Sequence, residues 1–275
     1  MDGRLRNLGT ALAAALLVVS AAGCTSSPSS APSTVDITPT AQPRPAPPPR
    51  MGSCHRLGFR QAMRPTAGTG SVPCSARHTS VTMFVGTFDP VVDGHLMAVD
   101  SGTVQKQLAD RCPRRLTSYV GGTETARRLS RLTTVWFGPT VAQADLGARW
   151  FRCDLVALRS DGRLAPLDAR MRGVLDHNDA LSTWGTCGTT APSARGFQRV
   201  VCSRPHQWRA VDVVPLPAGT HFLGRAASKE ADSRCHDIAS ARAGTRLKFT
   251  WSFEWPTRQQ WDSGQRYGYC WLPES

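Results

Sequence analysis

The stretch PTVAQADLGARWFRCDL, residues 139–155, returns later in the chain as PTRQQWDSGQRYGYCWL, residues 256–272. Eight of the 17 aligned positions are identical, at one constant offset and without a gap. Agreement of this kind between distant segments indicates an internal duplication, in which one structural unit is encoded twice. The chain is therefore predicted to contain two tandem repeats.

The cysteines follow the same duplication. The chain has nine cysteines, and leaving Cys24 aside divides the other eight into two sets of four: Cys54, Cys74, Cys112 and Cys153, then Cys187, Cys202, Cys235 and Cys270. Each set begins with a glycine two residues before its first cysteine, and its second cysteine stands four residues before a histidine, His78 or His206. The two repeats are predicted at residues 51–160 and 184–275, joined by a connecting segment at residues 161–183.

Hydrophobic periodicity gives each repeat the order β-α-β-α-β. Strands are expected after each histidine, then before and at the fourth cysteine: residues 81–85, 132–137 and 150–158, and again 210–214, 247–253 and 267–272. The fold class is therefore α+β, with two tandem disulfide-stapled repeats, each a small, mainly antiparallel sheet with a packed helix.

A helical pattern leads to or surrounds the third cysteine of each repeat. Its apolar positions are Leu96, Val99, Val104 and Leu108 in the first repeat and Ala226, Ala231, Cys235 and Ile238 in the second. A second, shorter helix of about two turns is expected between a proline and a glycine, at residues 139–147 and 256–264, because proline suits a helix start and glycine suits its end.

The first 24 residues have the pattern of an export signal. Two arginines precede a mostly apolar run from Leu8 to Ala22, which has the length of a signal h-region rather than of a membrane span. The run leads into Ala21–Cys24, which resembles a bacterial lipobox and predicts lipidation of Cys24; ordinary secretion after cleavage near Ala22 is the alternative. Residues 25–50 hold eight prolines and few apolar residues, so a disordered tether is expected.

The expected export of the chain bears on the chemistry of its cysteines, because disulfides form in oxidising compartments outside the membrane. An even, regularly placed set outside the membrane favours a disulfide framework over a zinc site or a Cys–His nucleophile, which remain as alternatives. Eight cysteines allow about 105 pairings, and one shared pattern within each repeat leaves about three. Pairing first with second and third with fourth is favoured, because it staples the entry loop to the first strand and the helix to the closing strand: Cys54–Cys74, Cys112–Cys153, Cys187–Cys202 and Cys235–Cys270.

His78 and His206 are the candidate ligand contacts, repeated on both halves. The alternative is a ring that bonds a neighbouring backbone group where the strand begins. Beside each capping glycine stand an aspartate and an arginine, Asp145 with Arg149 and Asp262 with Arg266, for which a local ion pair or turn contact is expected. Six of the eight tryptophans lie in the second repeat and are expected to pack in the core or half-buried. No cofactor or metal is expected.

The formal net charge of +13 favours contact with anionic lipid headgroups or wall polymers outside the membrane. Nucleic acid would suit the same charge, but the export signal argues against it. The sequence has no Gly-x-Ser-x-Gly, His-Glu-x-x-His or phosphate-binding glycine loop. Paired carboxylates remain open as a catalytic alternative, because Asp145, Asp262, Glu230 and Glu254 could meet in three dimensions.

The ordered motifs resemble the septum-formation family of actinobacterial envelope proteins. In the second repeat they are Gly185 with Cys187, Val200 with Cys202 and His206, Cys235, and Pro256 with Gly264, Arg266 and Cys270; the first repeat supplies the same set. Family members often carry a glutamate three residues after the histidine, where this chain has Val81 and Arg209. The resemblance implies a membrane-attached protein linked to division or wall organisation and implies no enzyme activity.

The resulting hypothesis is a lipid-anchored, extracytoplasmic and non-enzymatic protein that binds a wall polymer or an envelope or divisome protein. An enzyme acting on envelope polymers and an electrostatic docking module for anionic lipid or wall polymer are its two rivals.

Overall fold

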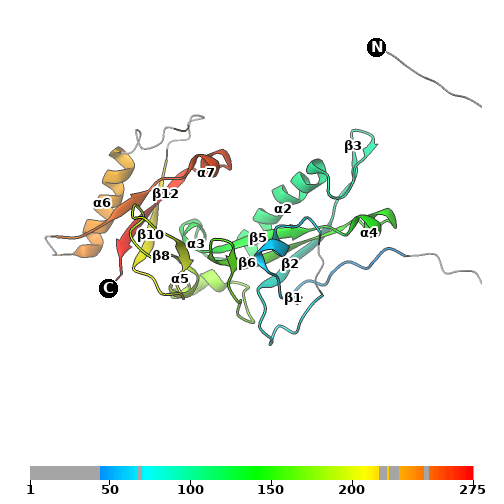
Figure 1. Ribbon diagram of the computed structural model, residues 1–275, viewed down its shortest axis with the longest axis horizontal. Coiled ribbons are helices and arrows are strands. Elements are labelled where there is room, and N and C mark those ends of the chain that lie inside the picture. Colours follow the sequence, from blue (N-terminus) through cyan, green and yellow to red (C-terminus); the bar gives the residue numbers. More distant parts are fainter. Residues whose placement is uncertain (1–43, 67–69, 217–221, 223–228, 245–247, 275) are drawn as a thin grey trace, which may run out of the picture. The chain divides into compact units, whose positions relative to one another are not determined.

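The computed structural model describes residues 44–66, 70–216, 222, 229–244 and 248–274 (Figure 1). The export signal, Cys24 and most of the expected tether lie outside the described residues, as do Ala226 and Leu247. The described fold is α+β, with antiparallel sheets, several helices and four disulfides.

The first sheet is antiparallel and has the strand order β1-β2-β6-β5. Its strands are β1 (Cys54–His55), β2 (Ser80–Thr87), β5 (Leu132–Phe137) and β6 (Trp150–Ser160), and β7 (Arg163–Leu164) pairs with the end of β6. The helices of this half are α1 (Phe59–Ala62), α2 (Gly102–Val120), α3 (Glu124–Leu129) and α4 (Val141–Asp145), and β3 (Val91–Val92) forms a hairpin with β4 (His95–Leu96).

The second sheet has the order β11-β12-β10-β8-β9. Its strands are β8 (Thr186–Gly188), β9 (Arg199–Val201), β10 (Trp208–Pro215), β11 (Ser252–Glu254) and β12 (Tyr267–Pro273), with helices α6 (Lys229–Ala243) and α7 (Arg258–Asp262). A 3-10 turn, η1 (Val174–Asp176), and α5 (Ala180–Trp184) precede this sheet. Below, residues 51–160 are called the N-terminal half and residues 184–275 the C-terminal half.

The two sheets share their central pattern. The two sheets have the same strand order if β1, β2, β6 and β5 are matched with β8, β10, β12 and β11. The second sheet has one extra strand, β9, beside β8. The register of the central pair also shifts at corresponding places, between Thr82 and Phe84 in β2 and between Ala210 and Asp212 in β10. In each half, the strand with the bulge pairs with the strand that carries the fourth cysteine.

Both short helices begin at a threonine that closes a capping box. The Thr140 side chain accepts a hydrogen bond from the Gln143 N–H, and the Gln143 side-chain oxygen accepts one from the Thr140 N–H; Thr257 and Gln260 repeat the arrangement in α7. The predicted prolines therefore lie just before the cap, not in the first turn, and each helix is five residues long. Gly147 and Gly264, at φ +98° and +93°, follow the helix ends as expected.

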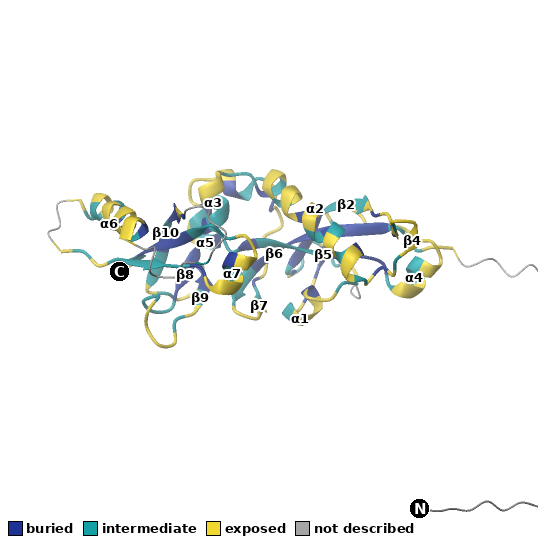
Figure 2. Cartoon of the chain, turned by 90° about the horizontal axis from the view of Figure 1, so that it is seen from above, coloured by how far each residue is buried: buried dark blue, intermediate teal, exposed yellow. Residues whose placement is uncertain are grey.

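The largest core lies between α2 and the first sheet. Val104, Leu108 and Cys112 of α2 are fully buried, and they belong to one cluster with Phe151 and Leu155 of β6. Figure 2 shows the contrast between the buried strands of this half and the exposed outer faces of its helices. The apolar stripe of α2 and the inward face of β6 therefore account for the position of this helix.

Two of the elements expected from the sequence are corrected, one in each half. Leu96 and Val99 were predicted on the α2 helix, but the helix begins only after the Ser101 cap, whose side chain accepts a hydrogen bond from Val104 N–H. Leu96 lies in β4 and is 72% exposed, and Val99 is buried in the turn before the cap. In the C-terminal half, the strand expected at residues 247–253 is described only from Ser252 to Glu254. The segment 161–183 contributes buried core residues to the N-terminal half, among them Leu167 and Met171.

The two halves also contact each other. Arg131 donates its backbone N–H to the Trp184 carbonyl oxygen at 2.7 Å, and Ser130 forms an isolated β-bridge with Gly185. The Tyr269 hydroxyl donates to the Arg128 carbonyl oxygen at 3.1 Å. Among the described helices, none is long and apolar enough to cross a membrane.

Candidate functional site

Every described cysteine is in a disulfide bond. The pairs are Cys54–Cys74, Cys112–Cys153, Cys187–Cys202 and Cys235–Cys270, which is the pairing that the sequence favoured. A sulfur in a disulfide is neither a nucleophilic thiolate nor a thiolate metal ligand. The catalytic-thiol and zinc alternatives therefore have no sulfur available in this oxidised chain, within residues 44–274 as described.

The two motif histidines make the same backbone contact. The ring of His78 bonds through Nδ1 to the Ala76 carbonyl oxygen at 2.9 Å, and His206 bonds through Nδ1 to the Arg204 carbonyl oxygen at 2.6 Å. Both rings therefore make the bond to a neighbouring backbone group that the sequence suggested as the alternative to a ligand contact. His78 is only 1% exposed, so its ring does not reach the surface, whereas the side chain of His206 is 15% exposed.

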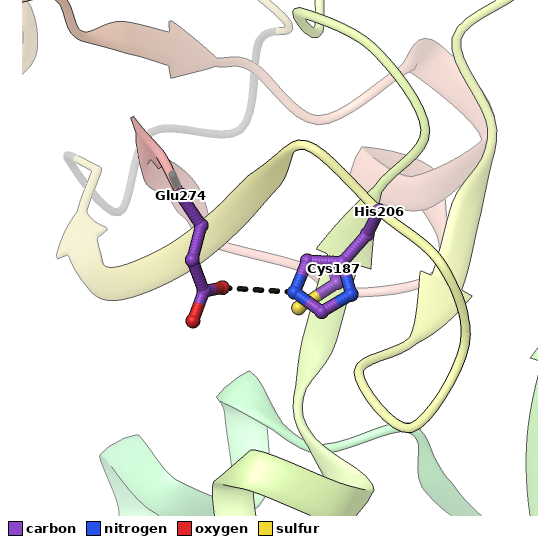
Figure 3. Close-up of side chains that lie close together, drawn as sticks. All are labelled: Cys187, His206 and Glu274. Atoms are coloured by element: carbon purple, nitrogen blue, oxygen red, sulfur yellow. Dashed lines mark hydrogen bonds and ion pairs between the residues drawn. The ribbon is translucent and has the colours of Figure 1, made fainter.

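His206 shares a carboxylate with Arg209 in the C-terminal half. Its Nε2 lies 2.8 Å from Oε2 of Glu274, a contact drawn as a dashed line in Figure 3. Arg209 donates to the same carboxylate twice, from Nε at 2.7 Å and from Nη2 at 2.8 Å. These hydrogen bonds, above all the pair from Arg209, hold the pKa of the Glu274 carboxyl below its usual value against a smaller opposing effect of burial.

Glu274, the residue after β12, is the shared partner of two residues of one motif: His206 and, three residues later, Arg209. Sequence reasoning missed Glu274, because 68 residues separate it from His206. The one available signal was the arginine itself, because an arginine that becomes partly buried in the fold needs an acidic partner. The sequence does not show which acidic residue that is.

Cys187, His206 and Glu274 place their ligand atoms within 4.8 Å of one another. The geometry alone would suit a metal ion, but Cys187 is bonded to Cys202. One imidazole and one carboxylate then remain, which is too few for a structural zinc site with four protein ligands. The cluster is therefore better described as an ion-paired surface beside a disulfide.

A cavity of about 390 Å³ adjoins this trio. It is lined by Arg209, Val211, Arg242, Leu272, Pro273 and Glu274. Arg242 of α6 donates to the Val211 carbonyl oxygen at 3.1 Å, so both arginines that border the cavity are held in place. Two fixed guanidinium groups and one carboxylate at an open cavity can bind a polar or anionic group by charge-assisted hydrogen bonds.

A second polar cluster is buried in the N-terminal half. Asp154 of β6 accepts hydrogen bonds from the Ser80 hydroxyl at 2.7 Å and the Thr82 hydroxyl at 2.8 Å, and lies 3.3 Å from Nη2 of Arg152. Nη1 of Arg152 lies 2.9 Å from Nε2 of His55. All five side chains are at most 3% exposed.

This buried cluster does not have the geometry of a catalytic triad. The Ser80 hydroxyl is bonded to Asp154 and not to the imidazole of His55, and none of the groups is open to a substrate. Burial lowers the pKa of the Arg152 guanidinium, and the charge of Asp154 opposes that shift. The cluster is structural, with each charge compensated inside the fold.

The remaining sequence candidates are dispersed. Arg149 donates to the Ala144 carbonyl oxygen at the end of α4, and Arg266 donates to the Trp261 carbonyl oxygen at the end of α7, so of the two local contacts expected beside the glycines, ion pair or turn contact, the structure shows the turn contact. Three of the four carboxylates considered for catalysis are held by three different arginines: Asp262 by Arg258, Glu230 by Arg234, and Glu254 by Arg199. Trp261 and Trp271 are buried, while Trp251 and Trp255 are half-buried.

The fold and site define a disulfide-stabilised α+β protein of antiparallel sheets, with a partly exposed trio in which His206 and Arg209 share the Glu274 carboxylate. The chain belongs to the septum-formation family, whose model matches residues 51–270 in a single span. Searches of curated proteins and of solved structures gave no significant match.

Proposed function

We propose that this protein is a lipid-anchored, extracytoplasmic binding module that contributes to septum formation without catalysing a reaction. Family membership supports the link to septum formation. The export signal and the lipobox-like Ala21–Cys24 support a membrane anchor at Cys24. Four disulfides fit an oxidising compartment outside the membrane.

The proposed architecture is a tandem duplication. Its support is the shared strand order and the bulge at the corresponding place in β2 and β10, together with the two capping boxes. In this scheme the N-terminal half is a scaffold with a closed polar core, and the C-terminal half presents the contact surface. The Arg209–Glu274 ion pair beside His206 and its adjoining cavity carries this assignment, because it is polar, fixed and accessible.

The contact surface is tested by capture of partners from envelope extract. Arg209→Ala and Glu274→Ala are expected to reduce specific capture at least tenfold, with the oxidised fold retained. Arg258→Ala is the matched control, because it removes an ion pair of similar length on the exposed face of α7. Equal capture by all variants, or loss of all partners at moderate salt, would replace the specific surface with electrostatic docking.

The anchor and the absence of catalysis are tested separately. Cys24→Ala is expected to move the protein from the membrane fraction to the soluble extracytoplasmic fraction and to cause a septum defect resembling that of depletion. Release of soluble fragments from purified wall polymer by the wild-type chain, abolished by one carboxylate substitution, would show an enzyme instead.

A further inference from the structure

A second cavity, in the N-terminal half, has a different chemical character. Its volume is about 390 Å³, in the range of small-ligand sites. It lies where α1 meets β5 and β6, with Phe59, Ala62 and Met63 on one side and Val135 and Val156 on the other. Most of its lining side chains are apolar, in contrast to the cavity beside Arg209.

The polar side chains that border this cavity include a pair satisfied within the protein. Trp136 donates its Nε1–H to Oε1 of Gln105 at 3.1 Å, and the amide of Gln105 donates to the Val99 carbonyl oxygen at 2.9 Å. The binding free energy of a ligand in this cavity would therefore come mainly from the removal of apolar surface from water. A hydrocarbon chain meets that requirement, whereas a sugar or a polar peptide would lose hydrogen bonds to water without replacement.

The rim of the cavity adds a charge. Arg64 is the charged residue in the lining; it is exposed, and no ion-pair partner for it occurs among the described residues. Arg60 stands four residues earlier, on α1, and is also exposed. Next to Arg64, Met63 is 69% exposed, although its side chain is apolar. Positive charge at the rim and uncovered apolar surface beside it suit an anionic head joined to an alkyl chain.

We infer that the cavity between α1 and the β5–β6 pair binds the alkyl chain of a single-chain anionic amphiphile, with Arg64 holding the head group. This site is separate from the Arg209–Glu274 surface, so either assignment can fail without the other. Among the described strands β5 pairs only with β6, so the strand that lines the cavity is at the edge of its sheet.

The test uses the oxidised full chain carrying Cys24→Ala, so that no lipid attached to Cys24 competes. The probes are n-alkyl phosphates of 8 to 16 carbons, titrated calorimetrically below their critical micelle concentrations. Affinity is expected to rise about fourfold per added methylene as long as each methylene is buried against apolar side chains of the cavity. It should level off once the alkyl chain fills the cavity. Affinity without chain-length dependence would overturn the inference.

Two variants locate the binding. Val135→Trp fills the cavity and is expected to weaken binding at least tenfold, while Val91→Trp, on the exposed β3 strand, leaves it unchanged. Arg64→Gln, a surface change that leaves the core intact, is expected to weaken alkyl phosphate binding five- to tenfold but not the binding of the neutral alkyl glucoside of equal length. Arg170→Gln is its exposed control.

The same variants separate cavity binding from attachment to a membrane surface. Phosphatidylglycerol vesicles are offered to wild-type protein and to Val135→Trp in a sedimentation assay. Sedimentation that is equal for both proteins, combined with no binding of soluble alkyl phosphates, would assign the affinity to surface charge and overturn the cavity site. Binding of soluble probes that Val135→Trp abolishes supports it.

Discussion

Asp154 of β6 and Trp271 of β12 occupy corresponding positions in the two sheets. Asp154 pairs with Thr82 immediately before the bulge of β2, and Trp271 pairs with Ala210 immediately before the bulge of β10. Both side chains are fully buried. One place in a shared strand pattern is thus filled by a hydrogen-bonded carboxylate in one half and by a large aromatic ring in the other.

Replacing Asp154 tests the polar core of the N-terminal half. Asp154→Ala leaves the Arg152 guanidinium buried without its counter-charge, so the free energy of unfolding is expected to fall by about 3–5 kcal/mol. Urea denaturation of the oxidised protein measures the change. Asp145→Ala, at an exposed position, should stay within about 0.5 kcal/mol of wild type. A small loss for Asp154→Ala would mean that water reaches the cluster.

In the C-terminal half, Glu254 depends on Arg199. Burial raises the pKa of the Glu254 carboxyl, and Arg199, 2.8 Å from Oε1, opposes that rise. Arg199→Gln removes the opposing charge, so the folded pKa rises further above the ordinary value of 4.5. A raised carboxyl pKa means that ionisation disfavours the fold, so stability should fall as pH rises from 4 to 7, by about 1–3 kcal/mol.

The control for that pH dependence is Arg199→Gln combined with Glu254→Gln, which removes the titrating group. Thermal unfolding midpoints recorded from pH 4 to pH 7 should then fall less with rising pH than those of the single variant, and less than those of wild type, in which the folded pKa of Glu254 is also raised. If the single and double variants have the same profile, another carboxyl causes the dependence.

Glu274 should show the opposite pH dependence. Its folded pKa lies below the ordinary value of 4.5, chiefly through hydrogen bonds from Arg209. The stability it contributes is therefore complete above about pH 4.5 and is lost as pH falls through the folded pKa. Because the side chain is 39% exposed, the expected contribution is at most about 1 kcal/mol.

Comparing wild type with Glu274→Gln measures this contribution. The difference in unfolding free energy should be constant between pH 5 and pH 6 and should shrink below pH 4.5. A difference that grows towards low pH would contradict the assigned direction of the pKa shift.

Removing one disulfide from each half tests the framework. The Cys112–Cys153 bond joins residues 41 apart and the Cys187–Cys202 bond residues 15 apart. In the chain-entropy model, replacing both cysteines by alanine lowers the unfolding free energy by about 4 kcal/mol in the first case and about 3 kcal/mol in the second. Non-reducing peptide mapping confirms that the other three bonds persist. Equal losses below about 1 kcal/mol would show that packing, and not the bonds, holds these segments.

The repetition of motifs along the sequence explains why much of the fold could be predicted. Each motif occurs twice, so two weak local signals support one interpretation, and the pairing of eight cysteines reduces to a few choices. The strand at residues 132–137 and the glycine-ended short helices follow from local patterns and agree with β5, α4 and α7. Leu96 shows the limit, because an apolar residue at helical spacing lies before the cap that sets the helix start.

The polar clusters were beyond such reasoning. His55 and Arg152 meet across 97 residues of sequence, and His206 and Glu274 across 68. Contacts of this kind depend on strand order and register, which no short motif encodes. A retrospective signal exists in β2 and β6, where Ser80, Thr82, Arg152 and Asp154 interrupt otherwise apolar strands at every second position. That alternation indicates a polar face, but not what covers it.

Each of the four disulfides joins two cysteines of the same half. The last cysteine of the N-terminal half is Cys153, and the first of the C-terminal half is Cys187. A single proteolytic cut between these two residues would therefore divide the oxidised protein into two fragments with no covalent link. The fragments would then be held together only by non-covalent contacts, among them the packing of Val201 in the core of the N-terminal half, the packing of Leu129 in a cluster with Tyr269, and the hydrogen bond from Tyr269 to Arg128. No disulfide spans residues 75–111, 154–186 or 203–234, and of these three segments the middle one is where a single cut would separate the two halves from each other, each with its own two disulfides.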